Sequence, residues 1–287
     1  MISVSLRDAI LSLLVVAALL GAGICLLVSL AQERLIFFPQ RLDQHAALGI
    51  QQLYPRSEAF ELAVEDGVRL RGWFVVGPAQ RAWPLIIYFG GNAEELSWLV
   101  PEFSRVADWA TLLVNYRGYG LSQGQPSERI LYRDALALYD HMTRRSDVDP
   151  GRVIVIGRSL GTGVATYLAS QRPVAGLVLI SPYDSLVQVA RDAYPFLPVG
   201  LLLRHRFDSA ARAPLIRAPL LALVAAQDDV VRPERSRRLV RVWGGPAHLE
   251  VLDGVDHNAV QSHSDYWKLI RAFLAERAVA PSTAPPR

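Results

Sequence analysis

A serine flanked by glycines is the residue of this chain best placed to act as a nucleophile. Ser159 lies within the motif GRSLG at 157–161, between a β-branched run at 152–156 and a small-residue, helix-like run at 160–170. A serine in a tight turn between a strand and a helix projects its hydroxyl above the sheet, and small flanking residues make room for the turn. The pattern therefore predicts a nucleophile elbow that attacks an acyl carbonyl.

An acid and a base follow the serine in the chain order that such an elbow requires. The apolar run Pro219–Ala226 predicts a buried strand that ends at Asp228 and Asp229. The next predicted strand, Ala247–Leu252, leads directly to His257. Histidine exchanges a proton near neutral pH, and a carboxylate fixes its tautomer and stabilises its charged form. We expect Asp228 to orient His257, as the earlier residue of a D-x-V-V turn, and Asp229 stays the alternative.

Acyl transfer also needs donors for the oxyanion, and two backbone positions can supply them. One is the N–H of Leu160, directly after the serine. The other belongs to the loop after the predicted strand Pro84–Phe89, where two glycines let backbone amides approach a ligand. We expect the Asn92 N–H to be the second donor, with Ala93 as the neighbouring candidate.

Strand and helix patterns alternate along the part of the chain that would position these residues. A predicted hairpin of strands at 58–64 and 68–75 comes first, and helical segments such as 130–144 then separate further strands. This alternation predicts an α/β fold with a mainly parallel sheet and helices on both faces. The site of such a sheet lies at the carboxyl ends of its strands, which is where all four predicted site segments fall.

One segment, 181–214, interrupts the alternation. It holds four prolines and an apolar run, Tyr194–Leu203, between the strand after the nucleophile and the strand before the acid. It fits either a short cap that shapes an apolar acyl pocket or a helix that packs on the sheet edge. Tyr183 lies near one strand end and Tyr116 and Arg117 follow another, so these three side chains are candidates for the substrate pocket.

The N-terminal segment has the length and composition of a membrane span. Residues 9–31 are uncharged and almost wholly apolar, and a helix of that length at about 1.5 Å per residue exceeds a hydrocarbon core of about 30 Å. The segment is longer than a signal-peptide core, although Ser29-Leu30-Ala31 would permit cleavage after Ala31. We expect an uncleaved single-pass anchor. On the signal-anchor interpretation the catalytic domain lies on the non-cytoplasmic side, although the flanking basic residues are nearly balanced.

Composition argues against several other classes of protein. The net charge is only +3, and the arginine clusters at 204–206 and 232–241 lack the interleaved aromatics or motif of a nucleic-acid site. A solvated helix face is the simpler interpretation of the second cluster, and attraction to anionic lipid headgroups the alternative. The single cysteine, Cys25, lies in the apolar segment, so no intramolecular disulfide can form. The predicted site implies no metal and no organic cofactor.

Four motifs give the chain its resemblance to the membrane-anchored serine hydrolases of the α/β-hydrolase superfamily. They are YFGGNAEE at 88–95, NYRGYGLSQGQPSE at 115–128, GRSLGTG at 157–163 and GVDHN at 254–258, spread through nearly the whole soluble part. The resemblance implies hydrolysis of an ester, thioester or amide, as in acylglycerol lipases and thioesterases and, more distantly, prolyl-oligopeptidase-like enzymes. Relatives often have His-Gly-Asn where this chain has Gly90-Gly91-Asn92, a departure that leaves the backbone donor unaffected.

We therefore expect a membrane-anchored serine hydrolase that cleaves a lipid-like ester or thioester through Ser159, His257 and Asp228. Two alternatives stay open. One is a serine peptidase, in which Glu94-Glu95 could hold a peptide terminus, and the other is a non-enzymatic anchored protein that uses the fold as an interaction surface. The expected organisation is a flank, an anchor, a connector, a hydrolase domain and a disordered tail, at 1–8, 9–31, 32–57, 58–278 and 279–287.

Overall fold

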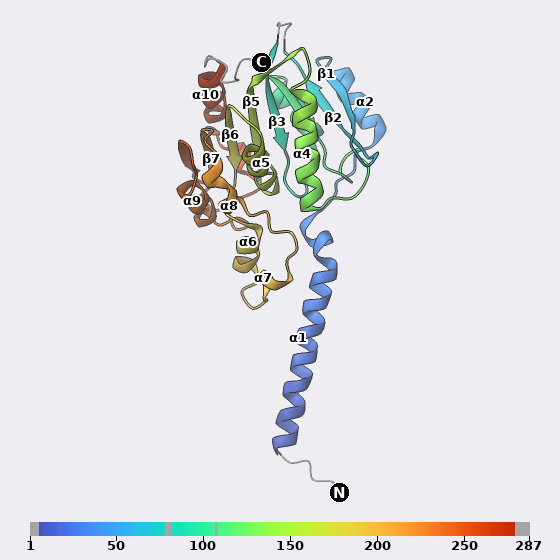
Figure 1. Ribbon diagram of the computed structural model, residues 1–287, viewed down its shortest axis with the longest axis vertical. Helices are drawn as coiled ribbons and strands as arrows, with labels where there is room; N and C mark the ends of the chain where they lie inside the picture. Colours follow the sequence, from blue (N-terminus) through green and yellow to red (C-terminus); the bar gives the residue numbers. More distant parts are fainter. Residues whose placement is uncertain (1–5, 78–81, 107, 279–287) are drawn as a thin grey trace.

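The computed structural model describes residues 6–77, 82–106 and 108–278 (Figure 1). An eight-stranded sheet forms its centre, in the order β1-β2-β4-β3-β5-β6-β7-β8. β1 and β2 pair antiparallel with each other and β2 pairs antiparallel with β4, whereas every later pairing is parallel. The strands are β1 Ser57–Ala63, β2 Arg69–Val75, β3 Trp83–Phe89, β4 Ala110–Val114, β5 Val148–Arg158, β6 Gly176–Ile180, β7 Leu220–Ala225 and β8 Ala247–Leu252. The predicted α/β fold with a mainly parallel sheet is confirmed.

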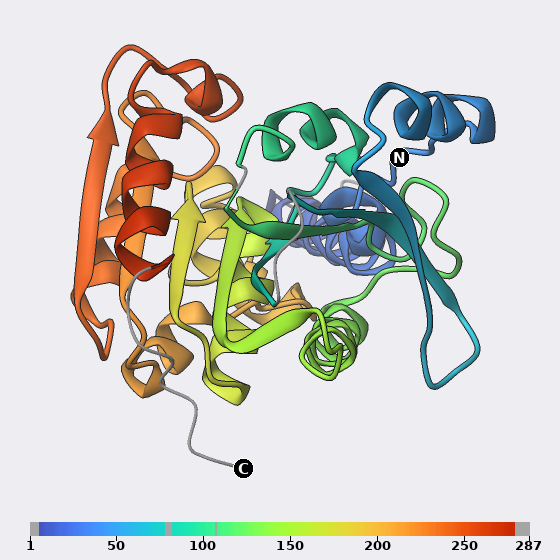
Figure 2. The same ribbon diagram turned by 90° about the horizontal axis from the view of Figure 1, so that it is seen from above.

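Helices cover both faces of this twisted sheet, as Figure 2 shows. One core cluster joins the sheet to α4 (Glu128–Met142), α5 (Leu160–Gln171) and α9 (Pro233–Arg241). A second joins the opposite face to α3 (Val100–Phe103), α10 (Tyr266–Ala278) and, at its margin, α2 (Gln44–Leu53). The central strands β3, β4, β6 and β7 are buried along their whole length, because both faces are covered. The shorter helical turns are η1 Leu96–Leu99 and η3 Val260–Ser262.

The helix α1 (Leu6–Ile36) extends away from the domain as a single rod (Figure 1). It contains the predicted 9–31 segment and continues further, so the connector expected at 32–57 begins inside the helix. No proline interrupts the helical run before Pro39, which accounts for the extra turn. By length and composition, Ala9–Ile36 is the one described helix that could cross a membrane, and none of its apolar window is buried in the protein.

The segment 181–214 forms a small helical protrusion instead of one packed helix. It contains α6 (Leu186–Ala193), α7 (Val199–Leu202), α8 (Ser209–Arg212) and η2 (Ala213–Leu215). The Glu128 carboxylate at the start of α4 accepts the backbone N–H groups of Arg206 at 2.6 Å and Phe207 at 2.9 Å. These bonds fix the returning limb, while α6 and α7 project toward the α1 side of the molecule (Figure 1). The predicted tail at 279–287 lies outside the described residues.

Candidate active site

The turn between β5 and α5 holds Ser159 in a strained conformation. Its backbone has φ 49° and ψ −116°, a region that side chains other than glycine rarely adopt. The flanking glycines are required by close backbone contacts. A Cβ on Gly157 would lie 2.6 Å from the Gly161 carbonyl oxygen, and one on Gly161 would lie 2.1 Å from the Phe89 carbonyl oxygen. Both distances are far below van der Waals contact, so the glycine spacing follows from how tightly α5 meets β3.

Ser159, His257 and Asp228 form one continuous hydrogen-bonded chain. His257 Nε2 lies 2.9 Å from Ser159 Oγ, and His257 Nδ1 lies 2.8 Å from Asp228 Oδ2. Asp228 and His257 are buried, whereas Ser159 is partly open to solvent. The other Asp228 oxygen accepts the N–H groups of Val230 at 3.1 Å and Val231 at 2.7 Å, which orients the carboxylate. Such a chain can transfer the serine proton to the imidazole and stabilise the resulting imidazolium.

Asp229, the alternative acid, lies at the surface beside Asp228. In the described part of the chain its carboxylate makes no ion pair and no hydrogen bond, whereas the Asp228 carboxylate contacts the imidazole directly. The turn distinguishes the two carboxylates, because its backbone N–H groups donate to the earlier one, that of Asp228.

The two expected oxyanion donors belong to loops that meet at the serine. Within the described residues, neither the Leu160 N–H nor the Asn92 N–H donates to another group of the protein. A Cβ on Gly91 would lie 3.7 Å from Ser159 Cβ, so the loop after β3 packs directly against the serine. Unengaged backbone donors in such loops can bind the negative charge of a tetrahedral intermediate.

The peptide that follows the Asn92 donor is held by the segment that leaves α1. The Asn92 carbonyl accepts the Phe38 N–H at 3.1 Å and also the Tyr119 hydroxyl. Phe37, next to Phe38, is buried against Phe207 at the base of the 181–214 protrusion. The sequence offered no signal for these contacts, because they join segments that lie 27 or more residues apart in the chain.

A buried carboxylate, Glu94, connects the oxyanion loop to the elbow. It accepts the Gly91 N–H at 2.7 Å and the Tyr88 hydroxyl at 3.2 Å, and it pairs with Arg158 Nη1 at 3.4 Å. Arg158 Nη2 in turn donates to the His257 carbonyl at 3.4 Å. Glu94 and Arg158 therefore join the three loops that carry the expected oxyanion donor, the serine and the histidine. Sequence reasoning missed this role, although the charged residue inside the GRSLG motif was a possible signal.

Besides the effect of burial, the Glu94 carboxylate raises the pKa values of both side chains that donate to it, Arg158 and Tyr88. Burial lowers the pKa of Arg158, but attraction to the buried Glu94 carboxylate outweighs it and holds that pKa above its usual value. Burial and the same carboxylate raise the pKa of Tyr88 well above its usual value, so its hydroxyl stays protonated and donates. Both side chains thus remain hydrogen-bond donors across the range of ordinary pH.

Two of the three expected pocket side chains donate hydrogen bonds to the backbone of the site loops. The Tyr116 hydroxyl donates to the Gly90 carbonyl at 3.0 Å, and the Tyr183 hydroxyl donates to the Leu160 carbonyl at 3.2 Å. Both tyrosines are buried, which raises their pKa values well above the usual range. They contact the backbone of the oxyanion loop and of the elbow.

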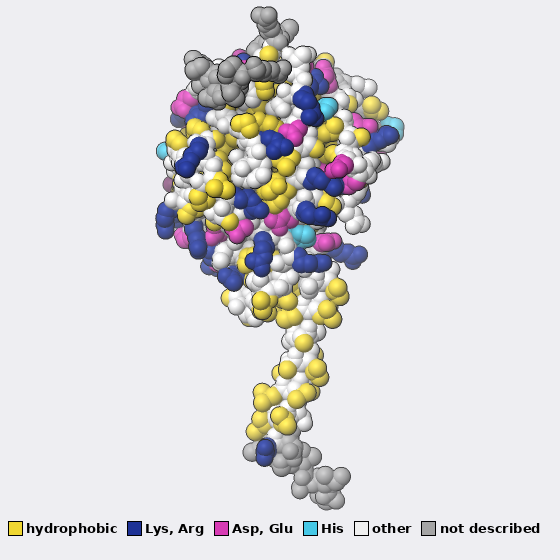
Figure 3. All heavy atoms as spheres, viewed as in Figure 1, with side chains coloured by type: hydrophobic (Ala, Val, Ile, Leu, Met, Phe, Trp, Pro, Cys, Tyr) yellow, Lys and Arg dark blue, Asp and Glu magenta, His cyan; other side chains and the backbone are white. Residues whose placement is uncertain are grey.

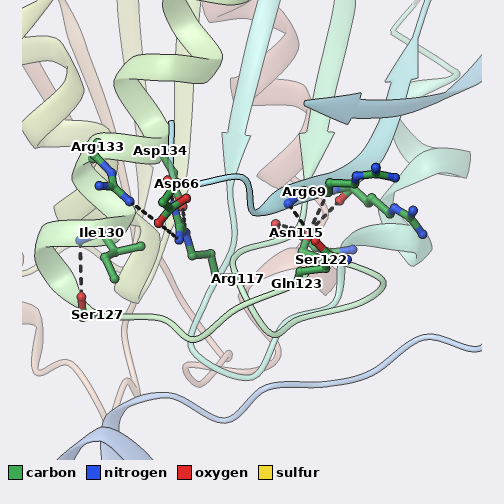
Figure 4. Close-up of polar contacts among 11 residues, drawn as sticks. Asp66, Arg69, Asn115, Arg117, Ser122, Gln123, Ser127, Ile130, Arg133 and Asp134 are labelled. Carbon is green, nitrogen blue, oxygen red and sulfur yellow. Dashed lines mark hydrogen bonds and ion pairs between the residues drawn. The ribbon is translucent and has the colours of Figure 1, made fainter. Parts of the chain in front are cut away.

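Arg117 lies elsewhere, against α4 (Figure 4). Its guanidinium pairs with Asp134 at 2.7 and 2.8 Å and with Asp66 at 2.6 and 3.1 Å, and its side chain is only 3% exposed. The structure does not bring it to Ser159, in contrast to the expected pocket position, because the two carboxylates occupy its donors. It instead ties the β1–β2 turn to α4, whose first turn is capped by the Ser127 hydroxyl.

A cavity of about 440 Å³ lies between α6 and α7. Its lining is mixed and includes Arg191, Arg206 and Asp208, the polar residues Ser185 and Gln188, and several apolar residues. None of Ser159, His257 and Asp228 lines it. Among residues 6–77, 82–106 and 108–278, no group of three or more His, Cys, Asp or Glu side chains could hold a metal ion.

Comparison with known proteins places these observations in a family. A model of the alpha/beta hydrolase fold matches residues 84–212. The chain is 35% identical over 273 residues to an uncharacterized protein of Mycobacterium tuberculosis, covering 94% of this chain and 96% of that protein. It is 30% identical over 288 residues to the alpha/beta hydrolase domain-containing protein WAV2 of Arabidopsis thaliana, covering 90% of this chain and 91% of that one.

A solved structure shows the same architecture. An esterase of Pyrococcus furiosus superposes with a TM-score of 0.67 at 18% identity, covering 85% of this chain and all of that one. At this identity the likeness concerns the fold alone. The sheet order, the strained turn after β5 and the relatives that match nearly the full length all agree with this architecture. The chain belongs to the α/β-hydrolase fold family.

Proposed function

We propose that this protein is a membrane-anchored serine hydrolase that cleaves an ester or thioester of a lipid-like acyl group. The observation that carries the proposal is the chain of hydrogen bonds from Ser159 Oγ to His257 at 2.9 Å and from His257 to Asp228 at 2.8 Å, on a strained turn. Membership of a hydrolase fold family agrees with this chemistry but does not by itself supply it.

In the proposed reaction, Ser159 Oγ attacks the acyl carbonyl carbon while His257 Nε2 accepts the hydroxyl proton. The carbonyl oxygen gains negative charge and is bound by the N–H groups of Leu160 and Asn92. The imidazolium, stabilised by Asp228, then gives its proton to the leaving alcohol or thiol as the acyl–oxygen or acyl–sulfur bond breaks. Water, deprotonated by His257, attacks the acyl-enzyme by the same steps and restores Ser159.

The lipid-like character of the substrate is proposed from the position of the site relative to α1. Phe38 lies two residues after the end of this apolar helix. Its backbone N–H donates to the Asn92 carbonyl of the oxyanion loop at 3.1 Å. A membrane-spanning α1 would therefore hold the site close to the bilayer surface. We further propose that residues 58–278 form the hydrolase domain, that 9–31 spans the membrane uncleaved, and that the domain lies on the non-cytoplasmic side.

A peptidase that binds a peptide amino terminus through Glu94-Glu95 is less well supported. Glu94 is buried and pairs with Arg158, and Glu95 accepts the Ser97 N–H at 3.1 Å and the Asn115 side chain at 2.7 Å. Both carboxylates are therefore occupied by the protein itself. The non-enzymatic interaction protein is also less well supported, because that role does not require a strained backbone at Ser159.

Labelling with a fluorophosphonate probe tests the proposal directly. The full chain in detergent should be labelled, and Ser159→Ala should abolish the labelling while retaining the same thermal unfolding profile. p-Nitrophenyl esters of graded chain length then measure turnover and acyl preference. Folded wild-type protein that neither reacts with the probe nor hydrolyses any ester of the series would refute the hydrolase proposal and favour the interaction protein.

A further inference from the structure

The end of the 181–214 protrusion exposes large apolar side chains to an unusual degree. Tyr194, Phe196 and Leu201 are 53%, 79% and 89% exposed, respectively. They lie in the loop between α6 and α7 and on α7 itself, which we call the cap tip, residues 194–203. Figure 3 shows apolar side chains gathered at this end of the domain, beside the emerging α1. Apolar side chains gathered at one end of a domain mark a surface that something else covers.

Contacts with α1 set the depth of the cap tip. The Gln32 side chain accepts the Arg204 N–H at 2.8 Å and donates to the Leu202 carbonyl at 3.3 Å, and Gln32 is buried. Arg204 Nη2 donates to the Ser29 carbonyl at 3.1 Å. The cap tip is thus held beside residues 29–32 of α1.

The length of α1 places those residues at a membrane boundary. The candidate span Ala9–Ile36 has 28 residues, whereas about 20 suffice to cross the hydrocarbon core. The polar residues Gln32, Glu33 and Arg34 all lie near its C-terminal end. Its last two turns therefore extend into the interfacial region, and the cap tip lies beside them. Apolar side chains held at this depth would enter the acyl region while the rest of the domain stays in water.

Exposed arginines border the cap tip. Arg34, Arg191, Arg204 and Arg206 are all exposed, and Figure 3 shows a band of basic side chains just above the apolar end. The nearby acids offset this charge only in part. Asp192 is paired with Arg235 at 2.6 Å, Asp208 caps α8, and Glu33 is half exposed near His205. An apolar tip below a band of arginines matches the layers of an anionic membrane surface.

We propose that the cap tip is a second membrane contact, which inserts Phe196 and Leu201 into the same leaflet that α1 leaves and sets the bordering arginines among the lipid phosphates. The inference rests on the proposed membrane role of α1. A second contact would fix the rotation of the domain about α1. It would also hold the site against the bilayer surface, so that a lipid substrate need not cross water.

Spin-label depth measurements test this contact in the full chain. Native Cys25 provides one labelling site within α1, and Leu201→Cys or Leu53→Cys provides another in a Cys25→Ser background. Leu53 is a matched control, since it is 76% exposed on α2, which lies away from the cap tip (Figure 1). In nanodiscs of phosphatidylcholine and phosphatidylglycerol, labels at Cys25 and Leu201→Cys should be relaxed more by oxygen than by an aqueous nickel chelate. The label at Leu53→Cys should show the reverse.

Each outcome decides the proposal. If the Leu201→Cys label is as accessible to nickel as the Leu53→Cys label while Cys25 is protected, the anchor stands and the second contact is wrong. If Cys25 itself is accessible to nickel, the anchor is wrong and the inference falls with it. Loss of fluorophosphonate labelling would overturn the proposed chemistry but leave the depth measurement unaffected, so the two failures can be distinguished.

A kinetic comparison adds a functional measure. The double variant Phe196→Asp and Leu201→Asp should lose at least about tenfold in hydrolysis of p-nitrophenyl dodecanoate carried in vesicles, because both apolar side chains lose their place in the acyl region. It should hydrolyse soluble p-nitrophenyl butyrate as the wild type does, and Leu53→Asp should leave both rates unchanged. Equal vesicle rates for the double variant and the wild type would overturn the contact.

Discussion

Replacing Asp228 with asparagine is expected to abolish most activity through the hydrogen-bond pattern of the turn that holds it. One Asp228 oxygen accepts the N–H groups of Val230 at 3.1 Å and Val231 at 2.7 Å, and the other faces His257 Nδ1 at 2.8 Å. An asparagine keeps both backbone bonds only if its amide oxygen faces the turn. Its NH₂ group must then face Nδ1, which becomes an acceptor and leaves the proton on Nε2.

A histidine protonated at Nε2 cannot accept the proton of Ser159, so the variant retains the geometry but loses the base. The expected loss in kcat is about 10⁴-fold, the size seen when a triad carboxylate is replaced by an amide. The assay measures kcat and KM on p-nitrophenyl butyrate for Asp228→Asn and for the exposed neighbour Asp229→Asn, with thermal unfolding as the folding control. Asp229→Asn should remain within about twofold of wild type. A loss of less than tenfold in Asp228→Asn, or the reverse ranking of the two variants, would refute this reasoning.

Three further perturbations have outcomes that the structure specifies. Gly161→Ala should lower the free energy of unfolding by at least about 2 kcal/mol in urea titration, because its Cβ would lie 2.1 Å from a carbonyl oxygen. Gly49→Ala, inside α2 with no atom near its Cβ, should be neutral or slightly stabilising, and equal effects would contradict the steric argument. Glu94→Gln should lower kcat by about tenfold with little change in KM, since it weakens the support of the oxyanion loop; an unchanged kcat would remove Glu94 from the positioning network. Hydrogen bonding to Arg117 holds the pKa of Asp66 well below its usual value, so its contribution to stability is present above pH of about 4 and is lost as the pH falls further. Melting temperatures of wild type and Asp66→Asn should therefore differ at pH 7 and converge at low pH, and a gap that stayed constant would contradict the linkage.

The local arrangement of the candidate site was predictable from the sequence. The spacing of Gly157, Ser159 and Gly161 follows from short-range sterics at a strand-to-helix turn, and strand periodicity identifies the sheet. The order of serine, acid and histidine along successive strand ends predicts that they meet, because parallel strands end at one edge. The structure brings together the side chains that this reasoning expected, Asp228 among them.

The tertiary structure alone decided which groups support those residues. Arg117 and Tyr116 are neighbours in sequence, yet one faces α4 and the other the oxyanion loop, because adjacent side chains leave the backbone on different sides. The Glu94–Arg158 pair and the bond from Phe38 to Asn92 join segments that are distant in the chain. Such contacts carry no periodicity and no local motif. They exist only because the order of strands in the sheet, and the direction in which α1 leaves it, bring those segments together.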